Sequence, residues 1–497
     1  MRDYTIFIPE YIAAAMAVAI IGIELFAPKF RKDWLAYVTA AGAAAWFVAG
    51  LFFIGKDPQS FQGLIRSDDF TTYFRLLAAG IVFVVSIMSA AHMATRTKAV
   101  AEYYGLLLVA GCGMVFMSAA TELLTAYISL ELLSFSLYIL VGYLKRDLLS
   151  SEASLKYILL GAFSSAMFLY GMSLIYGVTG STYYSGIADG LAAREAGTDW
   201  AVIAGMILIL TGVGFKVSAV PFHMWAPDAY QGAPLPITAF LSTASKAAGF
   251  ALILRLFTGA LIIDAVEWRW AVATLAVVTM TLGNLVAIQQ SNLKRLVAYS
   301  SIGQVGYMLI SIAAIGYGDA QSGQDASAAL LLHIVGYVVA TLALFAALTA
   351  AYNRTGREDI PSLRGLAETQ PFLALVITVA LFSFAGLPPF AGFATKLFMF
   401  QGAVTDDLIW VIGLAVLNSF ISLYYYLMVI RQMYLFDPVG DTARWKVGPV
   451  LGGLAAVLVV GVVAIGVYPG PLFEFADSAA EPLFDAAGLA DFQVQQP

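Results

Sequence analysis

Charge, cysteine and histidine are scarce in this sequence of 497 residues. Charged residues make up 12% of the chain, against about 25% in a soluble globular protein. The single cysteine, Cys112, excludes intrachain disulfides, cysteine-ligated iron–sulfur clusters and thiolate zinc sites. It lies within an apolar run, so we expect it to be a core residue. The net charge is −6 and no long basic run occurs, so no nucleic-acid partner is expected.

Hydrophobic residues make up 61% of the chain, against about 45–50% in soluble proteins. This leaves too few polar residues to cover a single core, and it indicates a multi-pass protein of the lipid bilayer. A helix needs about 20 apolar residues to cross a membrane. The apolar windows therefore predict an all-α fold with about fourteen transmembrane helices. The windows are 5–27, 33–54, 70–91, 101–120, 122–144, 154–178, 200–230, 234–257, 269–289, 293–316, 326–352, 371–403, 408–435 and 447–468.

Two of these windows, 200–230 and 371–403, are too long for one straight helix and contain proline, at Pro221 and at Pro388-Pro389. An internal proline removes a backbone hydrogen bond and kinks or breaks a helix. Hydrocarbon tolerates such a break only where other protein groups or water satisfy the freed backbone groups. We therefore predict that helices seven and twelve are discontinuous.

The two breaks share a short signature, Val220-Pro221-Phe222 and Pro388-Pro389-Phe390, offset by 168 residues. The same shift places the start of span four on the start of span nine, which predicts two five-helix units. A unit with an odd number of spans enters the membrane upside down in its second copy. Paired broken helices in such an inverted repeat point to an ion or substrate site. The predicted segments are 1–100 (three N-terminal helices), 101–257 and 269–435 (the two repeats), and 447–497 (a final helix and an acidic tail).

The distribution of Lys and Arg predicts the orientation, since cytoplasmic loops carry the excess of positive charge. One set of loops, with the span ends beside them, holds sixteen of these residues: Lys29, Arg31, Lys32, Arg96, Lys98, Lys145, Arg146, Lys156, Lys294, Arg295, Arg354, Arg357, Arg364, Arg431, Arg444 and Lys446. The opposite side holds seven: Arg2, Lys56, Arg66, Arg75, Arg194, Arg255 and Arg269. Both termini are therefore predicted on the non-cytoplasmic side. The tail from Pro469 agrees, because it is acidic and has no basic residue.

Four ionisable residues fall near the centres of separate predicted spans: Glu131, Lys216, Lys246 and Lys396. Each costs at least about 2.5–3.5 kcal/mol to insert at that depth. Ion pairs that only hold helices together are the alternative, but apolar replacements of such pairs are often equally stable. The set is therefore predicted to move protons.

Glu131 and Lys216 are predicted to act as a coupled switch. A lysine in a site of low dielectric holds its proton weakly, and a nearby carboxylate strengthens that hold. Lys216 would keep its proton while Glu131 is close, and would release it when the carboxylate is drawn away. Lys246 and Lys396 would pass protons further along a hydrated line at mid-membrane depth.

The histidines and the remaining buried acids are weaker candidates. Histidine titrates near neutral pH, so His223 beside the first break and His333 in span eleven are possible proton relays. A hydrogen-bonded structural histidine is the alternative for both. His92, at a loop edge, is expected to be solvated. Glu10 and Glu24 lie near the ends of span one, where a structural role is the simpler interpretation.

The runs around these charges resemble a known family. The run at 214–234 is GFKVSAVPFHMWAPDAYQGAP, followed by TASK at 243–246. Supporting runs are SLELLS at 129–134, YSSIGQVGY at 299–307, GLPPFAGFATK at 386–396 and YYYLMVIRQMY at 424–434. Over nearly its whole length the sequence resembles the antiporter-like membrane subunits of respiratory complex I. More narrowly, it resembles the subunit N family of NADH–quinone oxidoreductases and its mitochondrial counterpart, subunit 2.

The resemblance implies roles for single residues. The family's essential glutamate of helix five matches Glu131, its lysine of the broken helix seven matches Lys216, and its central lysine of helix eight matches Lys246. The terminal residue of helix twelve matches Lys396, where related cation-antiporter subunits usually have glutamate. The family also implicates Lys294 at the start of helix ten, although a boundary lysine serves equally well as a cytoplasmic anchor.

The resemblance further implies a proton-translocating subunit in a bacterial inner membrane, with no cofactor of its own. NADH, FMN, iron–sulfur clusters and quinone would belong to partner subunits, and neighbouring antiporter-like subunits would be among the partners. The alternatives are a subunit of a sodium/proton antiporter or of a membrane-bound hydrogenase, and a solute carrier with a midplane pocket. The chains that co-purify would separate these possibilities.

Overall fold

Helices account for every predicted span in the computed structural model, which describes residues 4–27, 31–194, 200–262, 265–315, 320–404, 407–438 and 443–484. In chain order they are α1 (Ile8–Phe26), α2 (Trp34–Leu51), α3 (Asp69–Ala94), α4 (Val100–Ala119), α5 (Leu123–Val141), α6 (Leu148–Thr179), α8 (Trp200–Val217) with α9 (Trp225–Gly232), α10 (Leu235–Gly259), α11 (Ala265–Ala287), α12 (Leu293–Ile315), α13 (Ala320–Thr355), α15 (Pro371–Ala385) with α16 (Ala391–Gly402), α17 (Ile409–Leu435) and α18 (Pro449–Val467).

Thirteen helices of the described residues are long and apolar enough to cross a membrane. The α15 helix has 15 residues and is shorter than that; together with α16 it fills the remaining predicted window. The prediction of an all-α, multi-pass membrane protein is therefore confirmed. The main deviations are at helix ends, since α6 and α13 each begin six residues before the predicted windows.

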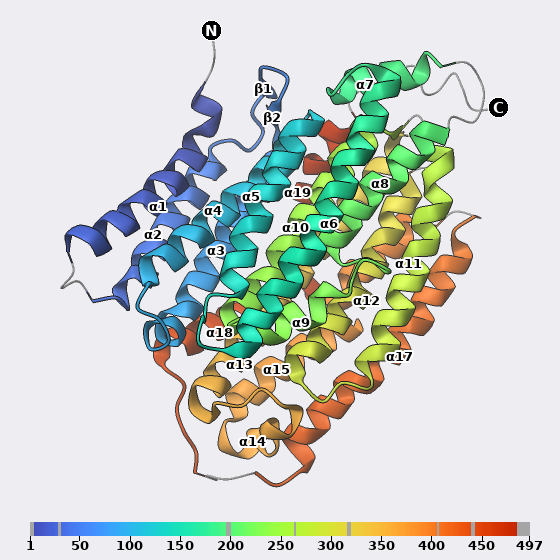
Figure 1. Ribbon diagram of the computed structural model, residues 1–497. Coiled ribbons are helices and arrows are strands. Elements are labelled where there is room, and N and C mark those ends of the chain that lie inside the picture. Colours follow the sequence, from blue (N-terminus) through green and yellow to red (C-terminus); the bar gives the residue numbers. More distant parts are fainter. Residues whose placement is uncertain are drawn as a thin grey trace.

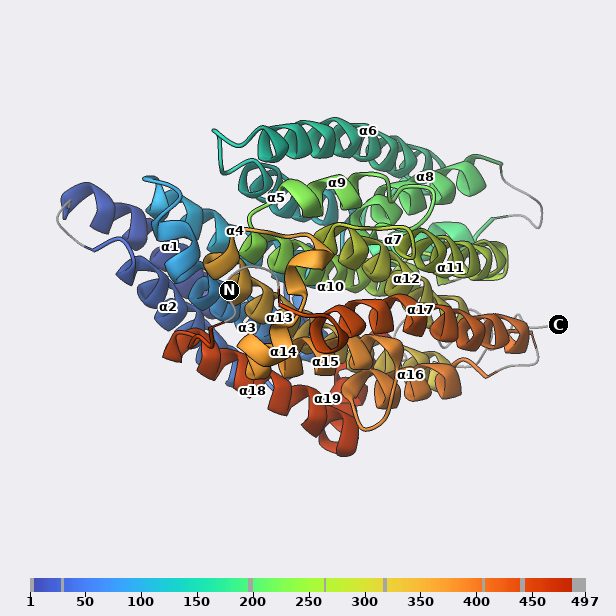
Figure 2. The same cartoon turned by 90° about the horizontal axis from the view of Figure 1, so that it is seen from below.

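The most buried helices form the middle of the bundle. The helices lie side by side, with their axes roughly aligned (Figure 1). Viewed from below, α6 lies at one edge and α18 at the opposite edge, with α10 and α13 between them (Figure 2). The most apolar stretches of α10, α12 and α13 are 100%, 94% and 89% buried, against 17% for α18. Groups carried by these three helices are therefore shielded from the lipid.

Both predicted helix breaks are present. The α8 helix ends at Val217, four residues before Pro221, and α15 ends at Ala385. The next residue in each case has a left-handed backbone, with φ of +68° at Ser218 and +81° at Gly386. A residue in this conformation ends a helix, so each break begins before its proline is reached. These two residues are offset by 168 positions, as the prolines are. The inverted orientation of the second repeat stays a prediction.

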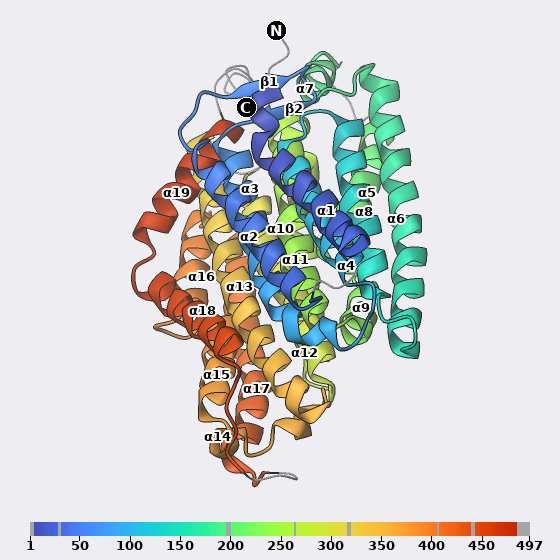
Figure 3. The same cartoon turned by 90° about the vertical axis from the view of Figure 1, so that its left-hand side faces the viewer.

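The two ends of the bundle carry different small elements. One end, here the hairpin end, holds η1 (Tyr4–Phe7), the hairpin of β1 (Gln59–Phe61) and β2 (Ile65–Ser67), and α7 (Tyr184–Ala192). The other end, here the α14 end, holds η3 (Ile360–Leu363) and α14 (Leu366–Thr369). Figure 3 shows these elements at opposite ends. The loops with the larger share of Lys and Arg lie at the α14 end.

The tail after Pro469 contains structure that the sequence did not predict. It continues as α19 (Gly470–Ala480) and η4 (Glu481–Leu483). The α19 helix packs on α13 and α3, and Gln324 donates to the Asp477 carboxylate at 3.1 Å. The η4 turn contacts α3 and α10. The last described residues therefore return to the hairpin end, where the first described residues also lie (Figure 3).

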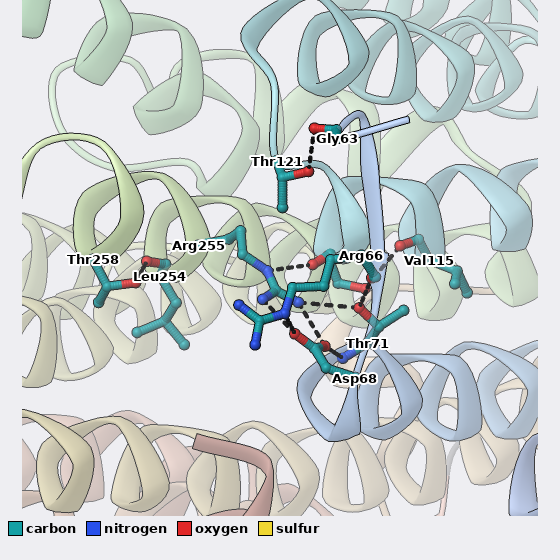
Figure 4. A network of polar contacts seen from close by, with 10 residues as sticks. Gly63, Arg66, Asp68, Thr71, Val115, Thr121, Leu254, Arg255 and Thr258 are labelled. Carbon is teal, nitrogen blue, oxygen red and sulfur yellow. Dashed lines mark hydrogen bonds and ion pairs between the residues drawn. The ribbon is translucent and has the colours of Figure 1, made fainter. Parts of the chain in front are cut away.

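Two arginines counted with the loops of the hairpin end are instead buried in ion pairs. Arg75 on α3 is 2% exposed and donates to the Glu10 carboxylate of α1 at 2.6 Å. Arg255 on α10 is 4% exposed and forms two bonds of 2.7 Å to the Asp68 carboxylate (Figure 4). Their burial was not predicted, because each guanidinium has an acidic partner in another part of the chain, which the order of residues does not reveal.

Asp68 joins three parts of the chain at the hairpin end. It caps α3 by accepting from the Thr71 amide at 2.9 Å, while Arg255 also donates to the Ser118 carbonyl at 3.0 Å. Burial alone would raise the pKa of Asp68, but the Arg255 guanidinium, the Thr71 amide and Arg66 together outweigh burial and hold that pKa below its ordinary value of 3.8. The pair therefore stays ionised and ties α3 and α4 to α10.

Candidate functional site

Glu131 lies on α5, where it is partly buried against α6. Ser165 on α6 donates to the Glu131 carboxylate at 2.5 Å, and its oxygen lies 3.2 Å from the Tyr127 hydroxyl. Within the described residues no ion pair to Glu131 is found, so it does not touch Lys216 directly. Lys216 instead contacts Ser134, which follows Glu131 by about one turn of α5.

Lys216 is the last residue but one of α8 and is 1% exposed. Its amino group donates to Ser134 Oγ at 2.9 Å. The last turn of a helix leaves carbonyl groups without helical partners, and side chains supply them here. Ser245 Oγ on α10 donates to the Lys216 carbonyl and Trp225 Nε1 on α9 to the Phe215 carbonyl, both at 2.8 Å. The break is thus stabilised from two helices, as its position in the bilayer requires.

Lys246 follows Ser245 on α10 and is 1% exposed. Its amino group donates to the Tyr230 hydroxyl of α9 at 2.6 Å, and it lies 5.1 Å from the centre of that ring. The same hydroxyl lies 3.3 Å from Ser301 Oγ on α12, which also donates to the Ala298 carbonyl at 2.7 Å. Lys246 is therefore connected to α12 through one tyrosine.

Lys396 on α16 is 4% exposed and reaches back over the second break. Its amino group donates to the Phe384 carbonyl at 2.9 Å and lies 4.2 Å from the centre of the Tyr307 ring, which is close enough for a cation–π contact. Gln304 Nε2 donates to the same carbonyl at 3.0 Å. Lys396, too, is therefore connected to α12.

The α12 helix joins the two lysine sites. Ser301 faces the Lys246 site, and Gln304 and Tyr307 face the Lys396 site. Residues three apart lie on one face of a helix, so these three side chains form a polar stripe inside an almost fully buried helix. The sequence analysis quoted this run without assigning it a role. Polar residues at a spacing of three within an apolar span were the signal.

The two histidines differ in their contacts. His333 on α13 shares a hydrogen bond of 2.8 Å with Thr395, the neighbour of Lys396, and its Nε2 is a buried atom without a partner among the described groups. His223, at the first break, is 8% exposed, and its Nδ1 likewise has none in the described part of the chain. His92 was expected to be solvated, which is wrong. It is 2% exposed because it packs against α13 and bonds to Asn353 at 2.9 Å.

The remaining candidates lie near the ends of helices. Lys294 at the start of α12 is 3% exposed and pairs with Glu358 at 2.9 Å. Glu24 at the end of α1 contacts Lys32 and accepts from the Ala101 amide at 2.9 Å. Cys112 is buried, as expected. No group of three or more metal-ligating side chains occurs among the described residues.

Relatives of this chain are named subunits of quinone oxidoreductases. A family described as NADH:quinone oxidoreductase/Mrp antiporter, TM, matches residues 120–422. NADH-quinone oxidoreductase subunit N of Dehalococcoides mccartyi is 41% identical over 490 residues, covering 96% of this chain and 99% of that relative. NAD(P)H-quinone oxidoreductase subunit 2 of a Nostoc species is 38% identical over 486 residues, covering 95% of this chain and 92% of that relative.

Solved structures show the same fold. A chain of respiratory complex I from Thermus thermophilus with bound aureothin has a TM-score of 0.78 at 31% identity, covering 95% of this chain and 100% of that chain. A chain of the Mrp complex from a Dietzia species has a TM-score of 0.84 at 21% identity, covering 98% of both chains. The second likeness concerns the fold alone.

Proposed function

Because the chain belongs to the subunit N family of NADH–quinone oxidoreductases, we propose that its buried charges form a proton-transfer line across the interior of this membrane subunit. The line runs from Glu131 through Lys216 and Lys246 to Lys396. The observation that carries this proposal is the polar stripe on α12, which contacts the partners of both Lys246 and Lys396. Buried polar groups at these positions would be costly without a role in transfer.

The first two charges form the coupled switch. The Lys216 amino group donates to Ser134, which lies on the same helix as Glu131, so a small movement of either charged side chain would change their electrostatic interaction. An ammonium near a carboxylate keeps its proton, and one left alone in a dry site releases it. A change in a neighbouring subunit that moves Glu131 would thereby send a proton from Lys216 towards Lys246.

Redox chemistry is assigned to partner subunits in this proposal. The relatives are named for the oxidation of NADH or NAD(P)H and the reduction of quinone, and FMN and iron–sulfur clusters would bind to those partners. The chain itself would contact neighbouring antiporter-like subunits and lipid. In a bacterial inner membrane, the basic α14 end would face the cytoplasm and both termini would face outward.

The proposal is tested by removing the switch lysine. Lys216→Ala should abolish or strongly reduce NADH-driven proton pumping by the assembled complex in proteoliposomes, measured with a pH-sensitive dye and normalised to complex content. Thr211→Ala on the same helix is the matched control, because in the described part of the chain its hydroxyl bonds only to the Ile207 carbonyl of α8. Unchanged pumping by the Lys216 variant would make that lysine structural and the switch wrong.

A second test separates charge from shape at Glu131. Glu131→Gln removes the negative charge that holds the proton on Lys216, so pumping should fall strongly. Glu131→Asp keeps the charge and should lose less. The comparison uses initial pumping rates of both variants at equal complex content. Equal losses would mean that the position of the carboxylate, and not its charge, is decisive.

A sodium/proton antiporter subunit is the second candidate, favoured by the fold shared with the Mrp complex. Such a subunit would exchange sodium for protons without NADH. Purification with a tagged chain decides between the two: co-purifying flavin and iron–sulfur subunits support the complex I role, and their absence together with a sodium-driven pH change supports the antiporter.

A further inference from the structure

An open hollow lies at the α14 end of the bundle, where α4 begins and α5 ends. These two helices pack side by side (Figure 2). The wall of the hollow is formed by the loop at 94–99, the first two turns of α4, and the stretch 139–146 at the end of α5. Its volume is about 790 Å³, within the range of about 300–1,000 Å³ that small-molecule sites occupy. The hollow is therefore large enough for a ligand.

Positive charge dominates the wall of this hollow. It contains four cations and one carboxylate: Arg96, Lys98, Lys145 and Arg146, with Glu102. Lys98, Lys145 and Arg146 are exposed, and none of them forms an ion pair within the described residues. Other cations of the α14 end do pair with carboxylates: Lys156, Lys294 and Arg357. The hollow therefore gathers positive charge that the described part of the chain does not balance.

The backbone around the hollow is held by contacts that leave these cations free. The Tyr143 hydroxyl, just after α5, donates to the Ala99 carbonyl at 2.5 Å, and the Tyr143 ring lies edge-on against Tyr103 of α4. On the other side of the loop, the Lys32 amino group donates to the Lys98 carbonyl. The loop is thus fixed through its main chain, while the Lys98 side chain remains available to a ligand.

The hollow continues from the charged loops onto apolar helix surface. Leu106 on α4 and Ile139 on α5 both line it. Leu106 lies six residues beyond the start of α4, which is about 9 Å along the helix axis, and Ile139 is 52% exposed. A ligand that fills the hollow therefore meets cations at the end of the bundle and hydrocarbon further into the membrane. A small soluble anion would use only the first of these.

We propose that this hollow binds one anionic phospholipid, with its phosphate among Lys98, Lys145 and Arg146 and an acyl chain along α4 and α5. Basic pockets between transmembrane helices on the cytoplasmic side bind anionic headgroups, and the α14 end is the predicted cytoplasmic side. Lysine and arginine donate charge-assisted hydrogen bonds to phosphate, which are roughly twice as strong as neutral ones. The Glu102 carboxylate accepts from hydroxyl groups, so a headgroup with hydroxyls beside its phosphate, such as that of phosphatidylglycerol, suits the wall best.

The test places the assembled complex in phosphatidylcholine nanodiscs that contain a trace of photoreactive phosphatidylglycerol or of photoreactive phosphatidylcholine, each with the reactive group on an acyl chain. Peptide mass spectrometry then measures labelling of residues 100–109 and 135–144. The phosphatidylglycerol probe should label wild type several-fold more than the phosphatidylcholine probe. The double variant Lys145→Gln, Arg146→Gln should lose this preference, whereas Lys145→Arg, Arg146→Lys keeps both charges and should retain it. The control is Arg431→Gln, Arg444→Gln, which removes two exposed cations elsewhere at the same end and should label as wild type does.

Three results would overturn the lipid site. Equal labelling by the two probes, or an unchanged preference in the Gln variant, would mean that the cations do not select the headgroup. Loss of labelling when inorganic phosphate is added in excess would make a free anion the ligand. No labelling by either probe would mean that another subunit of the complex covers the hollow. The measurement involves no pumping, so its failure leaves the proposed function untouched.

Discussion

At the scale of single residues, the three buried lysines differ in what accepts their hydrogen bonds. Lys216 donates to a serine hydroxyl, Lys246 to a tyrosine hydroxyl and Lys396 to a main-chain carbonyl. Hydroxyl groups both accept and donate hydrogen bonds, so they can pass a proton onward. Among the described residues the Lys396 amino group has a hydroxyl acceptor only at 3.5 Å, on Ser419, which fits the end of a line.

Lys396 provides a sharp test of proton release against fixed charge. A buried lysine can release its proton, whereas arginine cannot be deprotonated in proteins. Lys396→Arg should therefore block pumping almost as fully as Lys396→Ala, although it keeps the positive charge. Both variants are compared by pumping assays normalised to assembled complex. A structural cation would give the reverse pattern, with Arg tolerated and Ala harmful, and wild-type pumping by the Arg variant would end the relay role.

The residue types of the site could be predicted from the sequence, because charge in the middle of an apolar span is conspicuous. Their partners could not. Ser134, Tyr230 and Gln304 are ordinary residues in the sequence, and they matter only because separate helices bring them to the lysines. The same limit explains why the burial of Arg75 was not predicted and why His92 was wrongly expected to be solvated, since their burial depends on groups 65 and 261 residues away.

At the scale of elements, both local sequence and packing determine the two helix breaks. Proline predicted where helices seven and twelve are interrupted, but the helices end earlier, at residues of positive φ. Gly386 adopts this conformation at little cost, whereas Ser218 pays a steric cost for it. The bonds from Trp225 and Ser245 to the last turn of α8 hold that strained end in place.

The ion pair between Asp68 and Arg255, here the clamp, also acts between elements, since it joins α3, α4 and α10. Asp68→Asn leaves the guanidinium buried without its counter-charge, which costs about 3–5 kcal/mol. The variant complex should therefore unfold at a lower temperature than the wild type. Thermal unfolding of the two purified complexes measures this difference. Glu102→Gln, at an exposed position of α4, is the control.

The pH dependence of this clamp follows from the lowered pKa of Asp68. A carboxylate whose folded pKa is depressed adds stability above its unfolded value, and that stability is lost as the pH falls through the folded pKa. Since this lies below 3.8, the difference in unfolding temperature between wild type and Asp68→Asn should stay constant from pH 5 to pH 8. A difference that shrinks within this range would contradict the ionised pair.

At the scale of the whole molecule, the number of spans and their order could be predicted because apolar length is a strong signal. The η4 turn and the α19 helix could not, since they pack by contacts specific to the fold. The described chain both begins and ends at the hairpin end (Figure 3). The prediction that the hairpin end faces the non-cytoplasmic side still depends on the distribution of Lys and Arg among the loops.

A labelling experiment settles that side. A tag placed after Gln496, which lies outside the described residues, should be reached by impermeant reagents only from the non-cytoplasmic side. A tag in the basic loop that follows Gly356 at the α14 end should be reached only from the cytoplasm. Labelling of the terminal tag from the cytoplasm in oriented vesicles would overturn the proposed orientation.

The main-chain carbonyls at the site have a genetic consequence. Ala233, Phe384 and the Phe215–Lys216 pair offer acceptors that belong to the peptide backbone. No codon change removes a carbonyl oxygen, so a mutational scan should find Ala233 and Phe384 tolerant of side chains that fit their surroundings. Substitutions that inactivate the protein at these positions should instead be those that change the backbone conformation. At these positions the sequence therefore determines the course of the backbone and not a functional side chain.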